Sequence, residues 1–192
     1  MPKSFRPLVG LVLALCAGVA AATPVSTVVD FDGLKGGKLL PSVVGSTYSE
    51  DGYTITSVLN NDLFATASVF DADHAGETLS SSSLTFRSSS GAAFDLDSLD
   101  LSNALNTRGG AVLLTYWVAN EKPAFEVLGL DNKVGLQTFD LNLDDLTAFN
   151  LTSLGFQVDN IAVTAVSEPD SLALALAGLG IIATLARRRR EA

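Results

Sequence analysis

Residues 23–166 form a succession of short runs in which apolar or β-branched residues alternate with polar ones. A two-residue period places the apolar side chains on one face of a strand, and clusters of Gly, Asn, Asp and Ser separate the runs as turns would. The pattern predicts an all-β fold, an antiparallel β-sandwich that is jelly-roll-like. A parallel β-helix is the competing architecture, but the chain shows no fixed internal repeat. The predicted strands are residues 25–31, 53–58, 63–70, 78–86, 93–101, 111–119, 124–130, 135–141 and 153–166.

Three details sharpen this expectation. The alternation in run 93–101 breaks at Ser98-Leu99, which indicates a bulge or a sheet corner. Run 111–119 has large apolar residues on both faces, so it is expected to be a central strand that is covered on both sides. Within the body, only residues 144–149 carry a spacing that a helix would also show.

The charge of the body excludes several functions. Residues 23–168 hold six basic and 19 acidic side chains, a net charge of −13. Such a surface repels phosphate backbones and attracts divalent cations, so no nucleic-acid partner is expected. The single cysteine, Cys16, lies outside this body, which therefore cannot form disulfides, and a single histidine, His74, excludes a His-rich metal centre.

The amino-terminal segment has the three parts of a secretory signal peptide. Lys3 and Arg6 precede an apolar run at residues 8–19, and three alanines follow it. This order predicts a signal peptide over residues 1–22, removed by signal peptidase during export. A retained membrane anchor is the alternative, although the run is short for a span.

The carboxyl-terminal segment, residues 167–192, has a polar start, an apolar run at 172–186 and a basic tip. Fifteen helical residues reach roughly 22 Å against a hydrocarbon core of roughly 30 Å, so this single transmembrane helix would be short and would need snorkelling arginines. The positive-inside rule retains the tip in the cytoplasm and places residues 23–166 outside. Pro169 leaves an extended segment before the helix, which a protease needs. The tip consists of Arg187, Arg188, Arg189 and Arg190.

These three parts together resemble the PEP-CTERM sorting signal. Ser167 stands where the first proline of that family is expected, and the core of the motif, Glu168-Pro169, is intact. The resemblance covers about 25 residues. It implies recognition by an exosortase, a membrane transpeptidase-like enzyme of Gram-negative bacteria that also make exopolysaccharide. A plain carboxyl-terminal anchor without processing is the alternative.

Two acidic pairs lie at opposite ends of the body. Asp30 and Asp32 follow the first predicted strand, and Asp159 and Asn160 fall within the last. The first and last strands of a jelly roll lie side by side, so these four residues are expected to meet and to share a structural calcium ion. The alternative is a set of solvated carboxylates at strand ends.

No catalytic constellation is identified. The loop at residues 71–77 begins like an EF-hand, but Ala75 and Ser82 stand where ligands are required, and only a looser oxygen-ligand site is left. A catalytic role for His74 is disfavoured because no nucleophile turn accompanies it. Tyr48, Tyr53, Tyr116 or Trp117 would offer a sugar-stacking platform if exposed, although Trp117 in a central strand is expected in the core.

The sequence therefore predicts an exported protein that passes through the inner membrane, is held there transiently by its carboxyl-terminal helix, and is sorted to the cell surface or extracellular matrix. Its expected role is non-catalytic and associated with exopolysaccharide or biofilm, with glycan binding as a candidate activity. The rival is a small extracellular hydrolase acting on polysaccharide, since 19 acids guarantee some close carboxylate pairs.

Overall fold

The computed structural model describes residues 24–34, 42–59, 62–65, 77–105, 109–119, 121–131 and 133–166. Residues Pro24–Val166 form one compact unit. The predicted signal peptide, the carboxyl-terminal segment from residue 167 onward, and most of the acidic loop that contains His74 lie outside the described residues.

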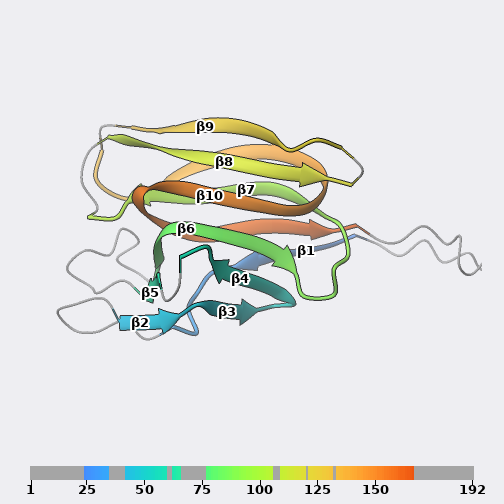
Figure 1. The fold of residues 1–192 in the computed structure, drawn as a ribbon, viewed down its shortest axis with the longest axis horizontal. Coiled ribbons are helices and arrows are strands. Elements are labelled where there is room, and N and C mark those ends of the chain that lie inside the picture. The colour runs from blue at the N-terminus through green and yellow to red at the C-terminus, as the bar shows by residue number, and fades with distance from the viewer. Residues whose placement is uncertain are drawn as a thin grey trace, which may run out of the picture. The chain divides into compact units, whose positions relative to one another are not determined.

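The described part is an antiparallel all-β fold without helices (Figure 1). In this part of the chain, no helix is long and apolar enough to cross a membrane, and the predicted span at 172–186 falls beyond it. The strands are β1 (Val25–Val29), β2 (Ser42–Gly45), β3 (Thr47–Glu50), β4 (Tyr53–Ser57), β5 (Leu63–Ala65), β6 (Leu79–Ser88), β7 (Phe94–Asn103), β8 (Gly110–Val118), β9 (Ala124–Leu130) and β10 (Gln137–Ala165).

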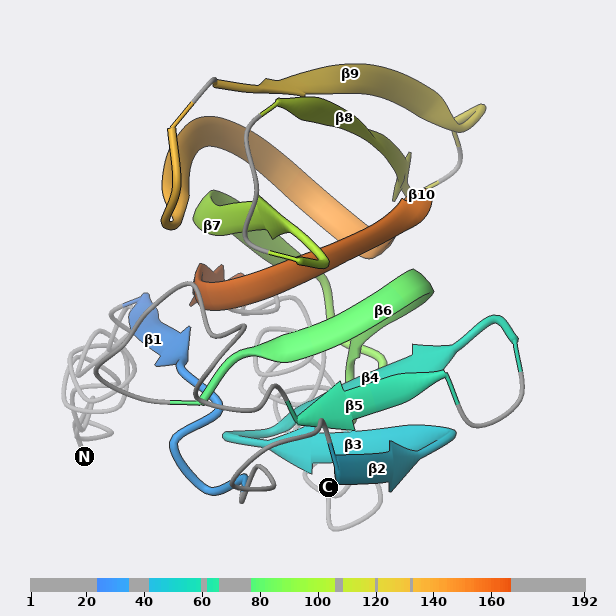
Figure 2. The same ribbon diagram turned by 90° about the vertical axis from the view of Figure 1, so that its left-hand side faces the viewer.

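The long strand β10 joins two groups of strands: β1 and β7 form one group, and β6 and β8 with their outer neighbours form the other. Its first part and its last part both pair with β7, and the last part also pairs with β1. Its middle part pairs with β6 and β8, which continue outward to β4 and β3 on one side and to β9 on the other. Figure 2 shows how strongly β10 curves between these positions. The arrangement is consistent with a β-sandwich.

Local backbone irregularities allow β10 to change partners. Asn142 and Asp145 adopt positive φ angles of 51° and 57°, and Gly155 has a φ of 151°. The pairing register shifts beside each of them. Bulges of this kind bend a strand and increase its twist. The helical reading of residues 144–149 is therefore wrong: Leu146 and Phe149 are three residues apart because the register shifts between them, and both are buried in a strand.

Aromatic rings from both groups of strands meet in the core. Phe149 of β10 stacks on Phe86 of β6 with ring centroids 4.8 Å apart, and Phe94 of β7 meets both rings edge-on. All three side chains are at most 1% exposed. Fully burying each such side chain contributes about 1.5–3 kcal/mol, so this cluster is a main source of stability.

Several sequence expectations are tested directly. β8 lies between β10 and β9, which confirms it as a central strand. Its expected cover on both faces is wrong, because Leu113 is 38% exposed while Leu114 is fully buried. The expected irregularity in β7 is confirmed: Leu96 pairs with Val163 and Ser98 with Ala162, which leaves Asp97 as the extra residue.

The first and last strands pair as expected. β1 is antiparallel to the end of β10, from Val25 opposite Ala165 to Val29 opposite Ile161. The short strands β2 and β3 were not expected. A two-residue turn at Asp51 and Gly52, both with positive φ, connects β3 to β4 as a hairpin.

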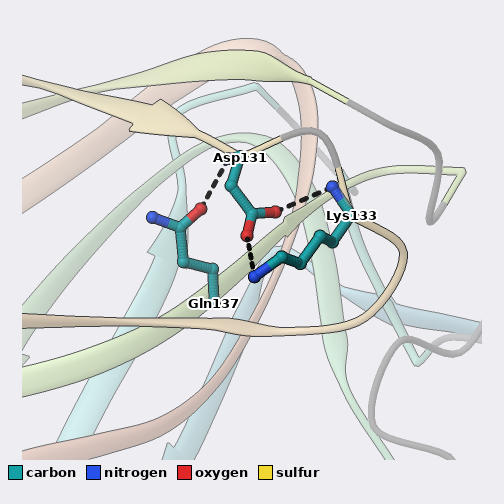
Figure 3. A network of polar contacts seen from close by, with 3 residues as sticks. All are labelled: Asp131, Lys133 and Gln137. Atoms are coloured by element: carbon teal, nitrogen blue, oxygen red, sulfur yellow. Dashed lines mark hydrogen bonds and ion pairs between the residues drawn. The ribbon is translucent and has the colours of Figure 1, made fainter.

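A small polar network closes the turn between β9 and β10 (Figure 3). The Asp131 amide donates to Gln137 Oε1 at 2.6 Å, and the Lys133 amide donates to Asp131 Oδ1 at 2.9 Å. Lys133 Nζ also lies 3.7 Å from Asp131 Oδ2, but its side chain is 85% exposed. The hydrogen bonds fix this turn, whereas an ion pair so exposed contributes little.

Candidate functional site

The body ends where the expected sorting segment begins. β10 runs to Ala165, and the Val166 amide then donates to the Ala93 carbonyl at 3.3 Å. The sorting residues Ser167, Glu168, Pro169 and Arg187–190 lie outside the described residues. The role of each of these side chains in sorting therefore stays a prediction.

At the other end, the segment after β1 is anchored by its middle residue. Phe31 is fully buried and has a positive φ of 60°, so its neighbours Asp30 and Asp32 are carried to the surface side. The Asp32 amide donates to Asp30 Oδ1 at 3.1 Å, which forms a local turn. Asp30 is half-buried and Asp32 is exposed.

Two residues of β3 support this segment. The Phe31 amide donates to Glu50 Oε2 at 3.1 Å, and the rings of Phe31 and Tyr48 lie 5.7 Å apart. Burial, and next the negative charge of Glu50, raise the pKa of Tyr48 well above its ordinary value. The phenol therefore stays a neutral donor near this carboxylate. Sequence reasoning missed Glu50, although the Asp51-Gly52 turn signal marks the strand before it.

The second acidic pair has partners of its own on β7. Asp159 is only 3% exposed, and its Oδ1 accepts the Asn160 amide at 2.8 Å. The Asn160 side-chain amide donates to Asp100 Oδ2 at 3.0 Å. Asp100 was also missed, because only the pairing of β10 with β7 brings it to Asn160.

The strand register brings the two pairs to the same end of one ladder. Val29 pairs with Ile161, so Asp30 and Asn160 leave the β1–β10 ladder side by side. Among the described residues, however, no three carboxylate, imidazole or thiol side chains gather as a metal site would require. Calcium prefers six to eight oxygen ligands. Two of the carboxylate oxygens here, Asp30 Oδ1 and Asp159 Oδ1, already accept hydrogen bonds from backbone amides. Calcium binding by Asp30, Asp32, Asp159 and Asn160 stays a prediction.

A slot opens on the outer face of the sheet formed by β6, β10 and β8. Its volume is about 360 Å³, and it is lined by Arg87, Ser88, Gly91, Trp117, Thr147 and Ala148. Ala148 pairs with Trp117, while Phe149 pairs with Phe86, which precedes Arg87. The small Ala148 side chain therefore forms the floor between two large ones. Trp117 is partly exposed on this outer face and does not belong to the buried core cluster, so its expected place in the core is wrong.

A second cavity of about 290 Å³ lies where the β8–β9 loop approaches the bend of β10. Its lining includes Tyr116 and two carboxylates, Glu121 and Asp144, together with Lys122 and Asn142. Both carboxylates are exposed. Two acids, one from the β8–β9 loop and one from β10, thus line one cavity, and a pair of carboxylates is one requirement of a glycosidase.

Comparison with known proteins identifies the carboxyl-terminal segment. A family model described as the PEP-CTERM protein-sorting motif matches residues 165–190. No curated protein matches the chain. A family 11 carbohydrate-binding module from Clostridium thermocellum, solved with a β-1,3-1,4-mixed-linked tetrasaccharide, is 13% identical, with a TM-score of 0.38 over 78% of this chain and 100% of that one.

The motif match confirms the resemblance found in the sequence. A PEP-CTERM motif implies export and a membrane-anchored sorting signal that is processed by an exosortase. The match begins at the last residue of β10, so the sorting signal starts where the folded body ends.

Proposed function

We propose that this protein is a non-catalytic component of the cell surface or of the extracellular polysaccharide matrix, delivered there by exosortase processing. The observation that carries the proposal is the position of the motif. The 165–190 match starts at the end of β10, so cleavage beyond it would release the whole sheet structure intact. The folded body would be the part of the protein that is delivered, and the motif would direct its delivery.

The composition of the body supports a role outside the cell. It has no cysteine, so its fold does not depend on the redox state of its surroundings. Its net charge of −13 over residues 23–168 favours solubility and disfavours phosphate-rich partners. Both properties are compatible with a surface component in a polysaccharide matrix.

The test replaces Glu168 and Pro169 by alanine in the full chain. We expect the variant to accumulate uncleaved in the membrane fraction, because the recognised segment before the helix is lost. The body should fold as before. An Asp170→Ala chain is the matched control and should be processed normally. Release of the Glu168/Pro169 variant at the wild-type rate would contradict the sorting role.

One observation favours a second candidate, a polysaccharide hydrolase: Glu121 and Asp144 line the same cavity. Incubation of the protein with exopolysaccharide from a producing strain separates the two functions. Saturable binding without new reducing ends supports the non-catalytic role. Turnover that is abolished by Glu121→Gln or Asp144→Asn would establish the hydrolase instead.

A further inference from the structure

The slot on the outer sheet face has the dimensions of a binding site for one ring. Neighbouring strands lie about 4.8 Å apart, so Arg87 and Trp117, one strand to either side of Ala148, are separated by about 10 Å at the backbone. Ala148 is 6% exposed and leaves the space between them open. The volume of about 360 Å³ between these two side chains is large enough for a six-membered sugar ring.

The chemistry of the two walls is complementary to a carbohydrate. Trp117 offers an apolar ring face, and Arg87 offers a fork of N–H donors. Arg87 is exposed, and within the described residues it forms no ion pair with a carboxylate. The Thr147 hydroxyl is already used, because it donates to the Trp117 carbonyl at 3.2 Å and ties the two strands together. A sugar ring has C–H groups for the indole and hydroxyl acceptors for the guanidinium.

The same face continues beyond the slot in both directions. On the β9 side, Phe125 is 75% exposed and pairs with Thr115, two residues before Trp117, so the two aromatic residues are diagonal neighbours on one face. On the other side, Thr54 pairs with Arg87, and its hydroxyl bonds to Ser89 at 2.8 Å and to Ser49 at 3.2 Å.

This row crosses six strands, from β3 to β9. Five strand spacings amount to about 24 Å, which suits an oligosaccharide rather than a single sugar. Hydroxyl groups occupy one end of the row and aromatic rings occupy the other end, with Arg87 and Ala148 between them.

The charge of the body decides which kind of glycan is favoured. With a net charge of −13 over residues 23–168, the protein repels a polyanion at long range, and one arginine does not reverse that field. A neutral polymer meets no such barrier. We propose that the slot formed by Arg87, Ala148 and Trp117 binds a neutral polysaccharide, with one pyranose ring against Trp117. This inference rests on the proposed role in the polysaccharide matrix.

Trp117 is the only tryptophan of the chain, so its fluorescence reports on the slot directly. The experiment uses the full chain in a zwitterionic detergent that carries no sugar, titrated with hydroxyethyl cellulose and dextran as neutral probes and with alginate as an acidic one. We expect a saturable fluorescence change with a neutral probe and an affinity that does not change with salt. Alginate should produce none.

Three variants locate the site, and their binding is measured by affinity electrophoresis. Trp117→Ala should weaken binding about tenfold or more through loss of the stacking surface. Ala148→Leu retains Trp117 but fills the space above the small Ala148 side chain, and it should weaken binding by a similar factor. Arg87→Gln, at an exposed position that the fold does not require, should weaken binding less. Leu154→Ala is the matched control at a fully exposed apolar position and should bind as the wild type does.

The outcomes separate this proposal from the sorting role. Wild-type affinity in both Trp117→Ala and Ala148→Leu would overturn the slot. Salt-sensitive binding of alginate alone would overturn the neutral ligand. Binding of neither probe by a chain that is still processed and released would overturn glycan recognition while leaving the sorting role intact. Glycan-independent self-association, lost on Phe125→Ser, would show that this face is a protein contact instead.

Discussion

The outer face of β7 and the outer face around Trp117 use their charged side chains in opposite ways. On β7, Asp95, Asp97 and Asp100 accept hydrogen bonds of 2.9–3.0 Å from residues of β10. Around the slot, Arg87 is exposed and has no carboxylate partner within the described residues. The acidic face thus uses its charges to hold the fold together. Around the slot the hydroxyl groups of Thr54 and Thr147 are already hydrogen-bonded, and the Arg87 guanidinium is the group left available for a ligand, so the density of charge does not mark the proposed binding surface.

The largest predicted effect tests whether the two faces belong to one cooperative unit. Phe149→Ala removes the ring that stacks on Phe86 and meets Phe94, and should lower the free energy of unfolding by about 3–5 kcal/mol. Urea unfolding followed by tryptophan fluorescence and by circular dichroism should show one shared transition. Two separate transitions would mean that the faces unfold independently, and Leu154→Ala serves as the surface control.

A second prediction concerns calcium binding by the acidic residues at the ends of β1 and β10. If Asp30, Asp32, Asp159 and Asn160 share an ion, calcium at 100 times its dissociation constant stabilises the fold by about 2.7 kcal/mol. The melting temperature should then rise with calcium and fall again with chelator. Asp32→Asn should reduce the shift, whereas Asp140→Asn should not. An identical transition with and without chelator would leave these carboxylates as purely structural groups.

A smaller effect concerns a carboxylate in the layer that carries the slot. Burial opposes ionisation of Asp62, but hydrogen bonds from Ser82 and Ser81 hold its pKa below the ordinary value. The stabilisation is therefore present above pH about 4 and is lost as the pH falls through the lower folded pKa.

Asp62→Asn should cost about 1–2 kcal/mol at neutral pH, less than the roughly 1.5–3 kcal/mol of a hydrogen bond to a charged group, because the amide side chain keeps one acceptor oxygen. The variant should also lose less stability than the wild type between about pH 4 and about pH 2. This is the range below the ordinary carboxyl pKa of about 4, in which the Asp62 carboxylate becomes protonated. Urea unfolding at several pH values measures both, with Glu121→Gln as control. Parallel pH profiles for wild type and variant would contradict the assigned role of Asp62.

The periodic parts of the fold are readable from the sequence, and its irregular parts are not. β8 and β9 are uninterrupted runs of apolar, aromatic and β-branched residues and are found where those runs predict strands. The sequence predicts two strands, 135–141 and 153–166, where β10 is continuous, because the strand passes through positive φ angles at Asn142 and Asp145 that shift its alternation without ending it. β2 and β3 are only four residues long, too short for periodicity to identify.

The candidate sites also differ in how far the sequence alone predicts them. The sorting motif is contiguous, so local sequence reveals it. The meeting of the first and last strands follows from the topology expected for a sandwich, but the partners Glu50 and Asp100 depend on side-chain contacts. The slot depends on the alignment of Arg87, Ala148 and Trp117, which only the pairing of three strands determines.

The pairing of β10 on both sides determines how the body would respond to tension. A pull on the carboxyl terminus enters the body at Ala165, which is flanked by Val25 of β1 and by Phe94 of β7. Peeling this strand away must break two ladders at once, whereas a terminal strand at a sheet edge would yield after one. Force applied through the carboxyl-terminal segment therefore meets the part of the sheet in which the terminal strand is paired along both of its edges.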